Sequence, residues 1–281
     1  MSASRHIFSR LSRSAPYQPA TNYWRAIELD AVRLHGLDGS RILDLGCGDG
    51  KLTSILLDIL DTAGEGTWIG VDPDPNETAL ADQSGVYERV HTCSGDCVPE
   101  ADGSFDLVFS NSVLEHIELI DPVIEEVSRL LRKNGRFLFT VPSSDFHSCL
   151  AGPLFGKADE AYRLEIDRRC AHVRYWSAEQ WKTELSRFGL SLSSHMSYLT
   201  AKQLARWELT SNLTGGLLYR LHGRSLQPID IQRKMNMRSQ SNGILGGLVH
   251  HASSLVLPGR TADADAKSDL YACLLVDAIK I

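Results

Sequence analysis

Short apolar runs that end in glycine or an acidic residue alternate along this chain with stretches of helical periodicity. Such runs, bounded by turn signals, are typical of strands that are buried on both faces. Strands that alternate with helices pair in parallel, because each helix returns the chain to the same edge of the sheet. The pattern predicts an α/β fold whose mostly parallel sheet is covered by helices on both faces. The runs are residues 41–46, 66–73, 86–96, 103–117 (continuing into a helix) and 135–143.

Signals of helix starts and stops mark the segments between these runs. Residues 121–135 open on Asp-Pro, carry acidic residues first and basic residues last, and end on glycine, as a complete helix does. Residues 177–189 begin with Ser, have Gln three positions later as in a capping box, and also end on glycine. Periodic segments at residues 23–35 and 51–64 predict two further helices.

The chain after residue 142 departs from this rhythm. Residues 143–174 are rich in Arg, Asp and Cys and are expected to be irregular. Residues 190–200 alternate like a strand, residues 201–266 resemble an added helical segment, and residues 269–281 form a final apolar strand. We expect this last strand to return to the first sheet.

Length and composition limit the class of protein. The 281 residues suit one large α/β domain with insertions, and 43% hydrophobic with 23% charged residues is ordinary for a soluble globular protein. The net charge of -6 argues against a dedicated nucleic-acid binder. We find no apolar run long enough to span a bilayer and expect a cytoplasmic protein.

The cysteines and the N-terminus carry further expectations. The six cysteines include no CxxC pair, so the sequence indicates neither a zinc site nor a redox pair. The first 16 residues contain Arg5, Arg10 and Arg13 and no acidic residue. We interpret them as a mobile basic arm, with an organelle presequence as the alternative.

The glycine-rich turn after residue 43 distinguishes between two kinds of nucleotide site. A dinucleotide fold uses GxGxxG after its first strand, whereas here the glycines are Gly46, Gly48 and Gly50, and Lys51 stands where the third glycine would be. Asp44, at the end of the strand, would repel a pyrophosphate and would attract an ammonium group. The turn therefore favours a cationic ligand without phosphate, and its glycines would let that ligand approach the backbone.

The second strand supplies an independent indication. Asp72 ends this strand, and a carboxylate at that place can accept both hydroxyls of a ribose. A ligand with a ribose, a cationic arm and no phosphate fits S-adenosylmethionine, whereas NAD and ATP do not fit.

Four motifs together resemble a known family. "LDLGCGDG", "GVDPD", "SGDCVPEADGSFDLVFSNSVLEHI" and "EVSRLLRKNGRFLFTVP" are similar to the successive motifs of class I S-adenosylmethionine-dependent methyltransferases, nearest to their type 11 group. The resemblance covers residues 41–143 well and the last strand loosely. It implies a Rossmann-like, doubly wound sheet of seven strands, the last one antiparallel and paired inside the sheet.

The resemblance also implies roles for single residues. It makes the turn from Asp44 to Gly50 the loop on the methionine side of the cofactor, and it makes Asp72 the ribose ligand. It places Asp96 against the adenine amine and the end of the fourth strand beneath the methyl group. The candidate cofactor residues are Asp44, Gly46, Cys47, Gly48, Gly50, Asp72, Pro73, Asp96, Cys97, Asn111 and Ser112.

These patterns divide the chain into regions of one catalytic domain. Residues 1–40 hold the basic arm and a helix, and residues 41–142 form the S-adenosylmethionine-binding core. Residues 143–266 form the acceptor-binding insert with the helical segment, and residues 267–281 contribute the final strand.

Two histidines are candidates for a base that removes a proton from a hydroxyl acceptor. His116 follows the fourth strand, and His172 lies in the insert after the fifth strand. For each of them a purely structural place is the alternative, His116 packed at the sheet edge and His172 ordering a loop. The sequence indicates no metal for either one.

The acceptor is the least specified part of the sequence. Arginines interleaved with aromatic residues between residues 158 and 176 suit sugars, phosphates or carboxylates, and a salt-bridged surface loop is the alternative. The surroundings are similar to bacterial methyltransferases that act on cell-surface glycans or lipid-linked sugars. The candidate acceptor residues are Tyr162, Arg163, Arg169 and Tyr175.

The segment near residues 244–256 leaves three alternatives open. Its apolar face follows a basic stretch, so it could lie peripherally on an anionic membrane, pack on the core or join two copies in a homodimer, and we favour packing. For the whole chain, a methyltransferase that acts on a hydroxyl oxygen of a small or glycan- or lipid-linked acceptor is the leading hypothesis. N- or C-methylation, an NAD-dependent enzyme on a similar fold, and a catalytically silent S-adenosylmethionine-binding subunit are the alternatives.

Overall fold

The computed structural model describes residues 3–62, 65–153, 156–214, 216, 219 and 270–281. The chain divides into two compact units. One unit combines Met1–Ala31, Asp145–His172 and Tyr198–Ala272, and the other combines Val32–Ser144, Val173–Ser197 and Cys273–Ile281. We call them the helical unit and the sheet unit.

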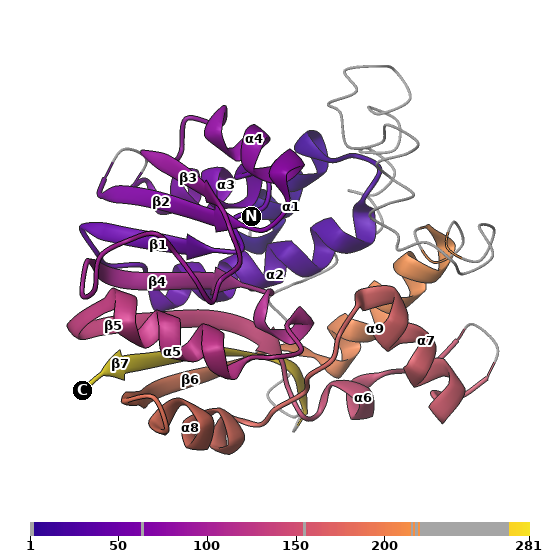
Figure 1. Cartoon of the computed structure of the whole chain (residues 1–281). Coiled ribbons are helices and arrows are strands. Elements are labelled where there is room, and N and C mark those ends of the chain that lie inside the picture. The colour runs from indigo at the N-terminus through magenta and orange to yellow at the C-terminus, as the bar shows by residue number, and fades with distance from the viewer. Residues whose placement is uncertain (1–2, 63–64, 154–155, 215, 217–218, 220–269) are drawn as a thin grey trace. The chain divides into compact units, whose positions relative to one another are not determined.

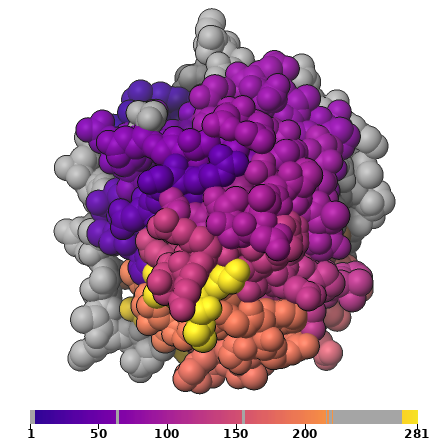
Figure 2. Space-filling view, turned by 60° about the vertical axis from the view of Figure 1, so that its left-hand side comes forward, coloured from indigo at the N-terminus to yellow at the C-terminus, as the bar shows by residue number. Residues whose placement is uncertain are grey.

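A sheet of seven strands is assembled from the described residues in the order β3-β2-β1-β4-β5-β7-β6 (Figure 1). The pairings of β1 with β2 and β4, of β2 with β3 and of β4 with β5 are parallel, whereas β7 is antiparallel to β5. This confirms the expected Rossmann-like sheet and the return of the last strand into it, and the yellow C-terminal end of that strand reaches the surface in Figure 2. The strands are β1 Arg41–Leu45, β2 Thr67–Asp72, β3 Arg89–Thr92, β4 Phe105–Asn111, β5 Leu131–Pro142, β6 Leu190–Thr200 and β7 Tyr271–Lys280.

Both faces of the central strands are buried, as the continuous apolar runs predict. In β1, Ile42 and Leu43 point to opposite faces because side chains alternate along a strand, and both are at most 3% exposed. One face packs on helices α5 (Asp121–Leu130) and α8 (Ala178–Ser186), whose Ile124 and Trp181 belong to the same core cluster as Leu43. Helix α3 (Lys51–Leu60) connects β1 to β2, and helix α4 (Pro75–Asp82) connects β2 to β3.

The predicted helix signals are confirmed at some ends and corrected at others. The capping box at the start of α8 is present, with both the Ser177 and the Gln180 side chains bonded to backbone. Helix α5 starts at the predicted Asp-Pro and includes Arg129, but it ends at Leu130, before Arg132, Lys133 and Gly135. Leu131 pairs with Phe105 of β4 through an irregular register, so sheet pairing replaces the last predicted turn of helix.

The helical unit departs most from the sequence expectations. The first residues are not a mobile arm, because they form helix α1 (Ala3–Ser14), which buries Ile7, Phe8 and Leu11 at spacings of one, three and four. The Ser4 hydroxyl bonds to Asp30 of helix α2 (Pro19–His35). Three arginines and no acidic residue obscured this apolar stripe.

The segment expected to be irregular contains helices α6 (Phe146–Cys149) and α7 (Glu160–Cys170). Helix α7 begins at Asp159, whose side chain accepts from the Tyr162 N–H, and its mixture of charged residues lacks a clear apolar period. Helix α9 (Ala201–Leu213) follows β6 and confirms the start of the added helical segment.

Two sequence hypotheses concern other parts of the chain. The apolar segment at residues 244–256, and with it the question of membrane contact or dimerisation, lies outside the described residues. In the part of the chain that the structure describes, none of the helices has the length and apolar character needed to cross a membrane.

Helix α1 gives the first prediction. Phe8→Ala is expected to lower the free energy of unfolding by about 3–4 kcal/mol, because the side chain is 2% exposed and its removal leaves a cavity. His6→Ala, at an exposed position of the same helix, should change it by less than about 0.5 kcal/mol. Urea denaturation measures both, and equal small effects would restore the mobile-arm interpretation.

Candidate functional site

The parallel pairing of β1, β2 and β4 brings three chain segments to one edge of the sheet. Because β1 lies between the other two strands, the turn after Leu45, the end of β2 at Asp72 and the end of β4 at Asn111 are neighbours. The carboxyl edge of an open parallel sheet is where such folds bind ligands. Most of the candidate cofactor residues therefore lie together in the sheet unit.

The glycine turn is tied to the neighbouring strand by backbone bonds. The N–H groups of Gly46 and Cys47 both donate to the carbonyl of Val71, at 2.8 and 3.0 Å. Gly46, Gly48 and Gly50 all have positive φ angles, of 81°, 53° and 75°, which L side chains rarely adopt. The turn thus needs glycine for its backbone shape before any ligand is considered.

The space beside these glycines differs from one to the next. A Cβ on Gly46 would lie 2.4 Å from Cγ2 of Val113, and a Cβ on Gly50 would lie 3.0 Å from both Ser84 and Tyr87. A Cβ on Gly48 would meet nothing within 4 Å. The protein itself therefore fills the places beside Gly46 and Gly50, and Gly48 is the glycine of the turn that faces open space.

Asp72 connects the end of β2 to the glycine turn. Its carboxylate accepts from the Gly48 N–H at 3.1 Å and from the Asp74 N–H at 2.9 Å. Partial burial raises the pKa of the Asp72 carboxyl, whereas these backbone N–H groups lower it. Pro73 follows in an exposed turn, and α4 begins two residues later with the Asp74 side chain as its cap.

Asp44 is a buried carboxylate held by two hydroxyls. It is 2% exposed, and its Oδ2 accepts from the Thr53 hydroxyl and from the Tyr87 hydroxyl, each at 2.6 Å. Burial raises the pKa of Asp44 to about 6, and the two hydroxyl bonds act in the opposite direction. Burial also raises the pKa of the adjacent Cys47 thiol, so this thiol is neutral at pH 7.

The carboxylates of this edge fit a ligand that carries a positive charge and hydroxyl groups. Among the described residues, no Lys, Arg or His pairs with the carboxylate of Asp44 or of Asp72, whereas Lys51 pairs with Asp49 in the same turn. A buried carboxylate without a positive partner is destabilised by desolvation. A bound cation would supply the missing partner.

The end of β4 supplies polar groups beside this turn. The Thr140 hydroxyl donates to Asn111 Oδ1 at 3.2 Å, and the Ser112 N–H donates to the carbonyl of Thr140 at 3.1 Å. Ser112 has a φ of 52°, which is uncommon for a residue other than glycine. The left-handed backbone conformation of Ser112 turns the chain away from the direction of β4 before the 3-10 turn at Leu114–His116 begins.

Asp96 and Cys97 follow β3, the edge strand, and both side chains are exposed. The only described backbone bond at this place is a short turn from the Cys97 N–H to the Ser94 carbonyl, at 3.3 Å. Their predicted contact with adenine remains a prediction.

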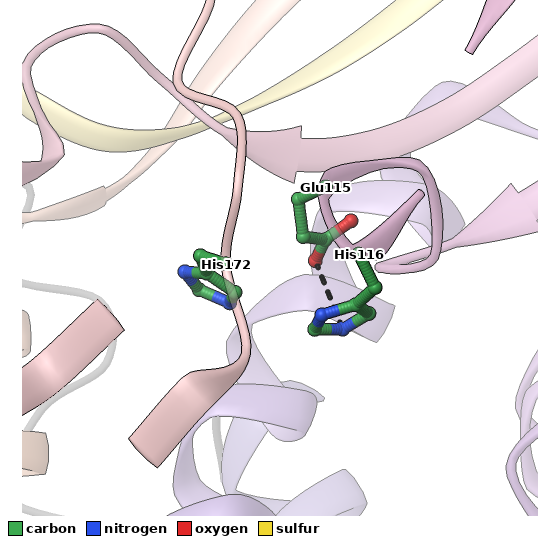
Figure 3. Close-up of side chains that lie close together, drawn as sticks. All are labelled: Glu115, His116 and His172. Atoms are coloured by element: carbon green, nitrogen blue, oxygen red, sulfur yellow. Dashed lines mark ion pairs between the residues drawn. The ribbon is translucent and has the colours of Figure 1, made fainter. Parts of the chain in front are cut away.

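A single 3-10 turn, η1 (Leu114–His116), follows β4 in place of a longer helix. Glu115 is 1% exposed, and one of its oxygens lies 3.9 Å from His116 Nε2, an ion pair when the imidazole is protonated (Figure 3). The His116 side chain is 39% exposed. The imidazole is thus partly open to solvent and lies beside a buried carboxylate.

The chain that re-enters the sheet unit after the insert holds this turn in place. The guanidinium of Arg174 donates three hydrogen bonds to carbonyls within residues 114–118, at 2.8, 2.8 and 3.1 Å. The Val173 N–H donates to the Glu115 carbonyl at 2.9 Å. The Trp176 ring lies beneath the guanidinium, 4.6 Å from it.

The aromatic packing continues from this arginine into the core of the sheet. The ring of Trp176 packs edge-on against Trp181 at 4.8 Å, and Trp181 packs against Phe139 of β5 at 4.7 Å. Such close-packed side chains resist displacement. The turn that carries His116 is therefore fixed to a rigid part of the sheet unit.

The other candidate residues belong mostly to the helical unit. His172 follows α7, and its ring packs edge-on against Phe146 and Trp24. Tyr162 and Arg169 are each 6% exposed. The Tyr162 hydroxyl donates to buried Glu208, and burial raises the pKa of Tyr162 to about 12.

Arg169 is held inside this unit as well, because it donates to Asn212 at 3.2 Å and lies over the ring of Trp207. Arg163 is exposed on α7, and Tyr175 lies half-buried in the sheet unit. A pocket of about 490 Å³ runs along α7, where Tyr162 and Arg168 line it together with Leu164.

The chain matches a family model described as a methyltransferase domain over residues 5–214. It belongs to this methyltransferase family. It is 31% identical over 114 residues to a sterol 4-C-methyltransferase of Caenorhabditis elegans, covering 38% of this chain and 33% of the relative. It is 28% identical over 103 residues to a ubiquinone biosynthesis O-methyltransferase of Agrobacterium fabrum, covering 35% of this chain and 39% of the relative. The chain thus spans between a third and two fifths of the length of these curated relatives.

A solved structure of geranyl diphosphate methyltransferase in complex with S-adenosylmethionine superimposes with a TM-score of 0.53 at 15% identity. The superposition covers 92% of this chain and 84% of the geranyl diphosphate methyltransferase chain. This likeness shows a shared fold, and the strand order with the family match identifies a methyltransferase domain of this Rossmann-like class. The carboxylates of Asp44 and Asp72 fit S-adenosylmethionine, the methyl donor that the sequence resemblance implies, because it carries a sulfonium, an ammonium group and a ribose.

Three residues of this methyltransferase site escaped the sequence reasoning. Tyr87 reaches Asp44 across 43 positions, Val113 fills the space beside Gly46, and Arg174 holds η1 across about 60 positions. No local pattern marks such contacts, because each depends on two segments that only the sheet brings together. For Arg174, the interleaving of arginine with aromatic residues was the only available signal.

The buried carboxyl of Asp44 leads to a prediction about pH. Its pKa of about 6 lies above the usual value, so the ligand-free site takes up a proton as the pH falls through 6. A cationic ligand favours the carboxylate, and binding below this pH must displace that proton. The affinity for S-adenosylhomocysteine, which retains the ammonium group, should fall by up to about tenfold per pH unit below pH 6 and stay level above it.

Calorimetric titration between pH 5 and pH 8 measures this dependence. Asp44→Asn should bind more weakly at pH 7.5 and lose most of the dependence. An affinity of the unaltered protein that stays level down to pH 5 would contradict the assignment.

The glycine turn gives a matched pair of variants. Gly46→Ala and Gly48→Ala both introduce a Cβ at positive φ, which costs about 1 kcal/mol of stability. Only the first also forces Val113 aside, so it should lower the melting temperature further. Gly48→Ala should instead weaken S-adenosylhomocysteine binding more than it lowers the melting temperature. Thermal unfolding with and without ligand tests the contrast, and identical behaviour of the two variants would contradict it.

Proposed function

We propose that this methyltransferase methylates a hydroxyl oxygen of a small or glycan- or lipid-linked acceptor, with His116 as the base. The observation that carries the proposal is the Glu115–His116 pair on η1, directly after the strand end that the resemblance places beneath the methyl group. A hydroxyl acceptor must lose its proton when its oxygen attacks a carbon, and an imidazole is a side chain that can take up such a proton.

The residues of the sheet edge have separate tasks in this proposal. S-adenosylmethionine supplies an activated methyl group on its sulfonium. Asp44 holds the ammonium group, and Asp72 accepts from the ribose hydroxyls. His116 Nε2 takes the acceptor proton, and the nearby Glu115 carboxylate stabilises the imidazolium. Alignment of these groups lowers the activation free energy by several kcal/mol, as in other reactions between bound partners.

His172 is the second candidate for the base. It directly precedes Val173, whose N–H is bonded to the Glu115 carbonyl, and its ring is oriented by Phe146 and Trp24. The same set of variants distinguishes the two histidines.

The acceptor contacts that we propose divide according to burial. Exposed Arg163 and half-buried Tyr175 are available to touch the acceptor. Tyr162 and Arg169 are bonded within the helical unit, and they shape it through Glu208, Asn212 and Trp207. Within the helical unit, the pocket along α7 has an apolar wall at Leu164 and a positive charge at Arg168.

Methylation of carbon is the second candidate function. It is favoured by the sterol 4-C-methyltransferase relative, which is 31% identical over 114 residues. A carbon acceptor also loses a proton, before the new bond forms if it reacts as an enolate and after it if it reacts as an alkene. Product analysis distinguishes the two outcomes, because an O-methyl group blocks the hydroxyl as an ether, whereas a C-methyl group leaves the hydroxyl unmodified.

The test screens phenols, sugars, lipid-linked glycans and sterols with S-adenosylmethionine labelled in its methyl group. With an active hydroxyl acceptor, His116→Ala should lower kcat by about 10² or more and leave S-adenosylhomocysteine binding unchanged. His172→Ala is measured beside it, and His195→Ala, an exposed histidine on β6, is the matched control. Full activity of both candidate variants would mean that no histidine base acts, and transfer to carbon alone would favour the second function.

A further inference from the structure

A tyrosine that no sequence motif marks lies at the carboxyl edge of β1, β2 and β4. We call this edge, which carries Asp44, Asp72 and Asn111, the cofactor edge. Tyr87 stands in the segment between α4 and β3, and its hydroxyl donates to Asp44 Oδ2 at 2.6 Å. Thr53, on the first turn of α3, donates to the same oxygen at the same distance. Both hydroxyl bonds therefore end on one oxygen of the carboxylate, and none of the hydrogen bonds among the described residues ends on Oδ1.

The ring of Tyr87 has a place that two glycines leave for it. A Cβ on Gly50 would lie 3.0 Å from Tyr87 Cε2, and a Cβ on Gly70 would lie 3.3 Å from Tyr87 Cδ1. Gly50 begins α3 and Gly70 lies in the middle of β2. The ring thus fits between a helix start and a strand, where any larger residue at either glycine would displace it.

We propose that Tyr87 and Thr53 are positioning residues for S-adenosylmethionine, which clamp Asp44 through Oδ2 so that its other oxygen is available to the ammonium group. The proposal rests on the family's S-adenosylmethionine site and not on the acceptor or on the histidine base. The proposal explains why Gly50 is needed although no ligand can enter the space beside it: the Tyr87 ring occupies that space.

The charges around Asp44 show what the clamp does. The groups that face this carboxyl are the hydroxyls of Thr53 and Tyr87, the carboxyl of Asp72 and the thiol of Cys47. Burial and the Asp72 charge both favour the protonated form of Asp44, and the two hydroxyl bonds oppose them. Without the clamp, the carboxyl would stay protonated to a higher pH and would attract a cation less strongly at a given pH.

Tyr87→Phe separates the two roles of this residue, because it keeps the ring between the glycines and removes only the donor. At pH 7.5 we expect the Kd for S-adenosylhomocysteine to rise about 3- to 10-fold, the net effect of one hydrogen bond. The pH at which binding becomes weaker should also move upward, since Asp44 loses a bond that favours its charged form. Thr53→Val should shift the same two quantities in the same direction.

Thr78→Val is the matched control. Thr78 is also a buried threonine of the sheet unit, but its hydroxyl bonds to that of Thr92 at 2.6 Å and not to Asp44. This variant should leave both the Kd and its pH dependence unchanged. Melting temperatures of the ligand-free variants establish that each one is folded.

Asp44→Asn separates a failure of the clamp from a failure of the site. If Asp44→Asn weakens binding and Tyr87→Phe changes neither the Kd nor the pH profile, the clamp is overturned and the cofactor site stands. If Asp44→Asn itself binds S-adenosylhomocysteine like the unaltered protein, the ammonium assignment of Asp44 is wrong and the clamp falls with it. A raised Kd with an unshifted pH profile in Tyr87→Phe would also overturn the proposal, because it would mean that the hydroxyl affects binding without acting through the charge of Asp44.

Discussion

The parallel pairing of β1 with both β2 and β4 is the constraint on which the cofactor edge depends. It brings Asp44, Asp72 and Asn111 from three separate strand ends to one side of the sheet. Two backbone bonds from the glycine turn to Val71 then fix the turn to β2. Each strand would be an ordinary buried run in isolation, and the site exists because their carboxyl ends coincide.

Electrostatics makes this edge selective. A carboxylate that is buried without a cation is unfavourable, and here the hydroxyls of Thr53 and Tyr87 offset only part of that cost. A bound cation would offset the rest of this desolvation cost. The ligand-free site is therefore less stable, and the binding of a cation correspondingly more favourable. The same two carboxylates would repel a phosphate, so this edge is expected to favour a sulfonium ligand over a dinucleotide.

Much of the sheet could be predicted from sequence because its strands are apolar, continuous and ended by glycine or aspartate. The N-terminal helix and α7 could not, because their polar composition hides a short apolar stripe in one case and any clear period in the other. The histidine candidates illustrate the same limit. Sequence placed His116 after β4, but only the fold shows the buried Glu115 beside it and the Arg174 bonds that hold its turn.

The sequence by itself determined the class of fold, which follows from local features such as strand length and turn residues, and the charge of Asp44 led to the hypothesis of a cationic ligand. The tertiary structure alone decided which atoms surround that charge. Tyr87 and Asp44 are 43 residues apart, and Val113 and Gly46 are 67 apart. Contacts at such separations depend on the order of strands in the sheet, and no periodicity within a single segment records that order.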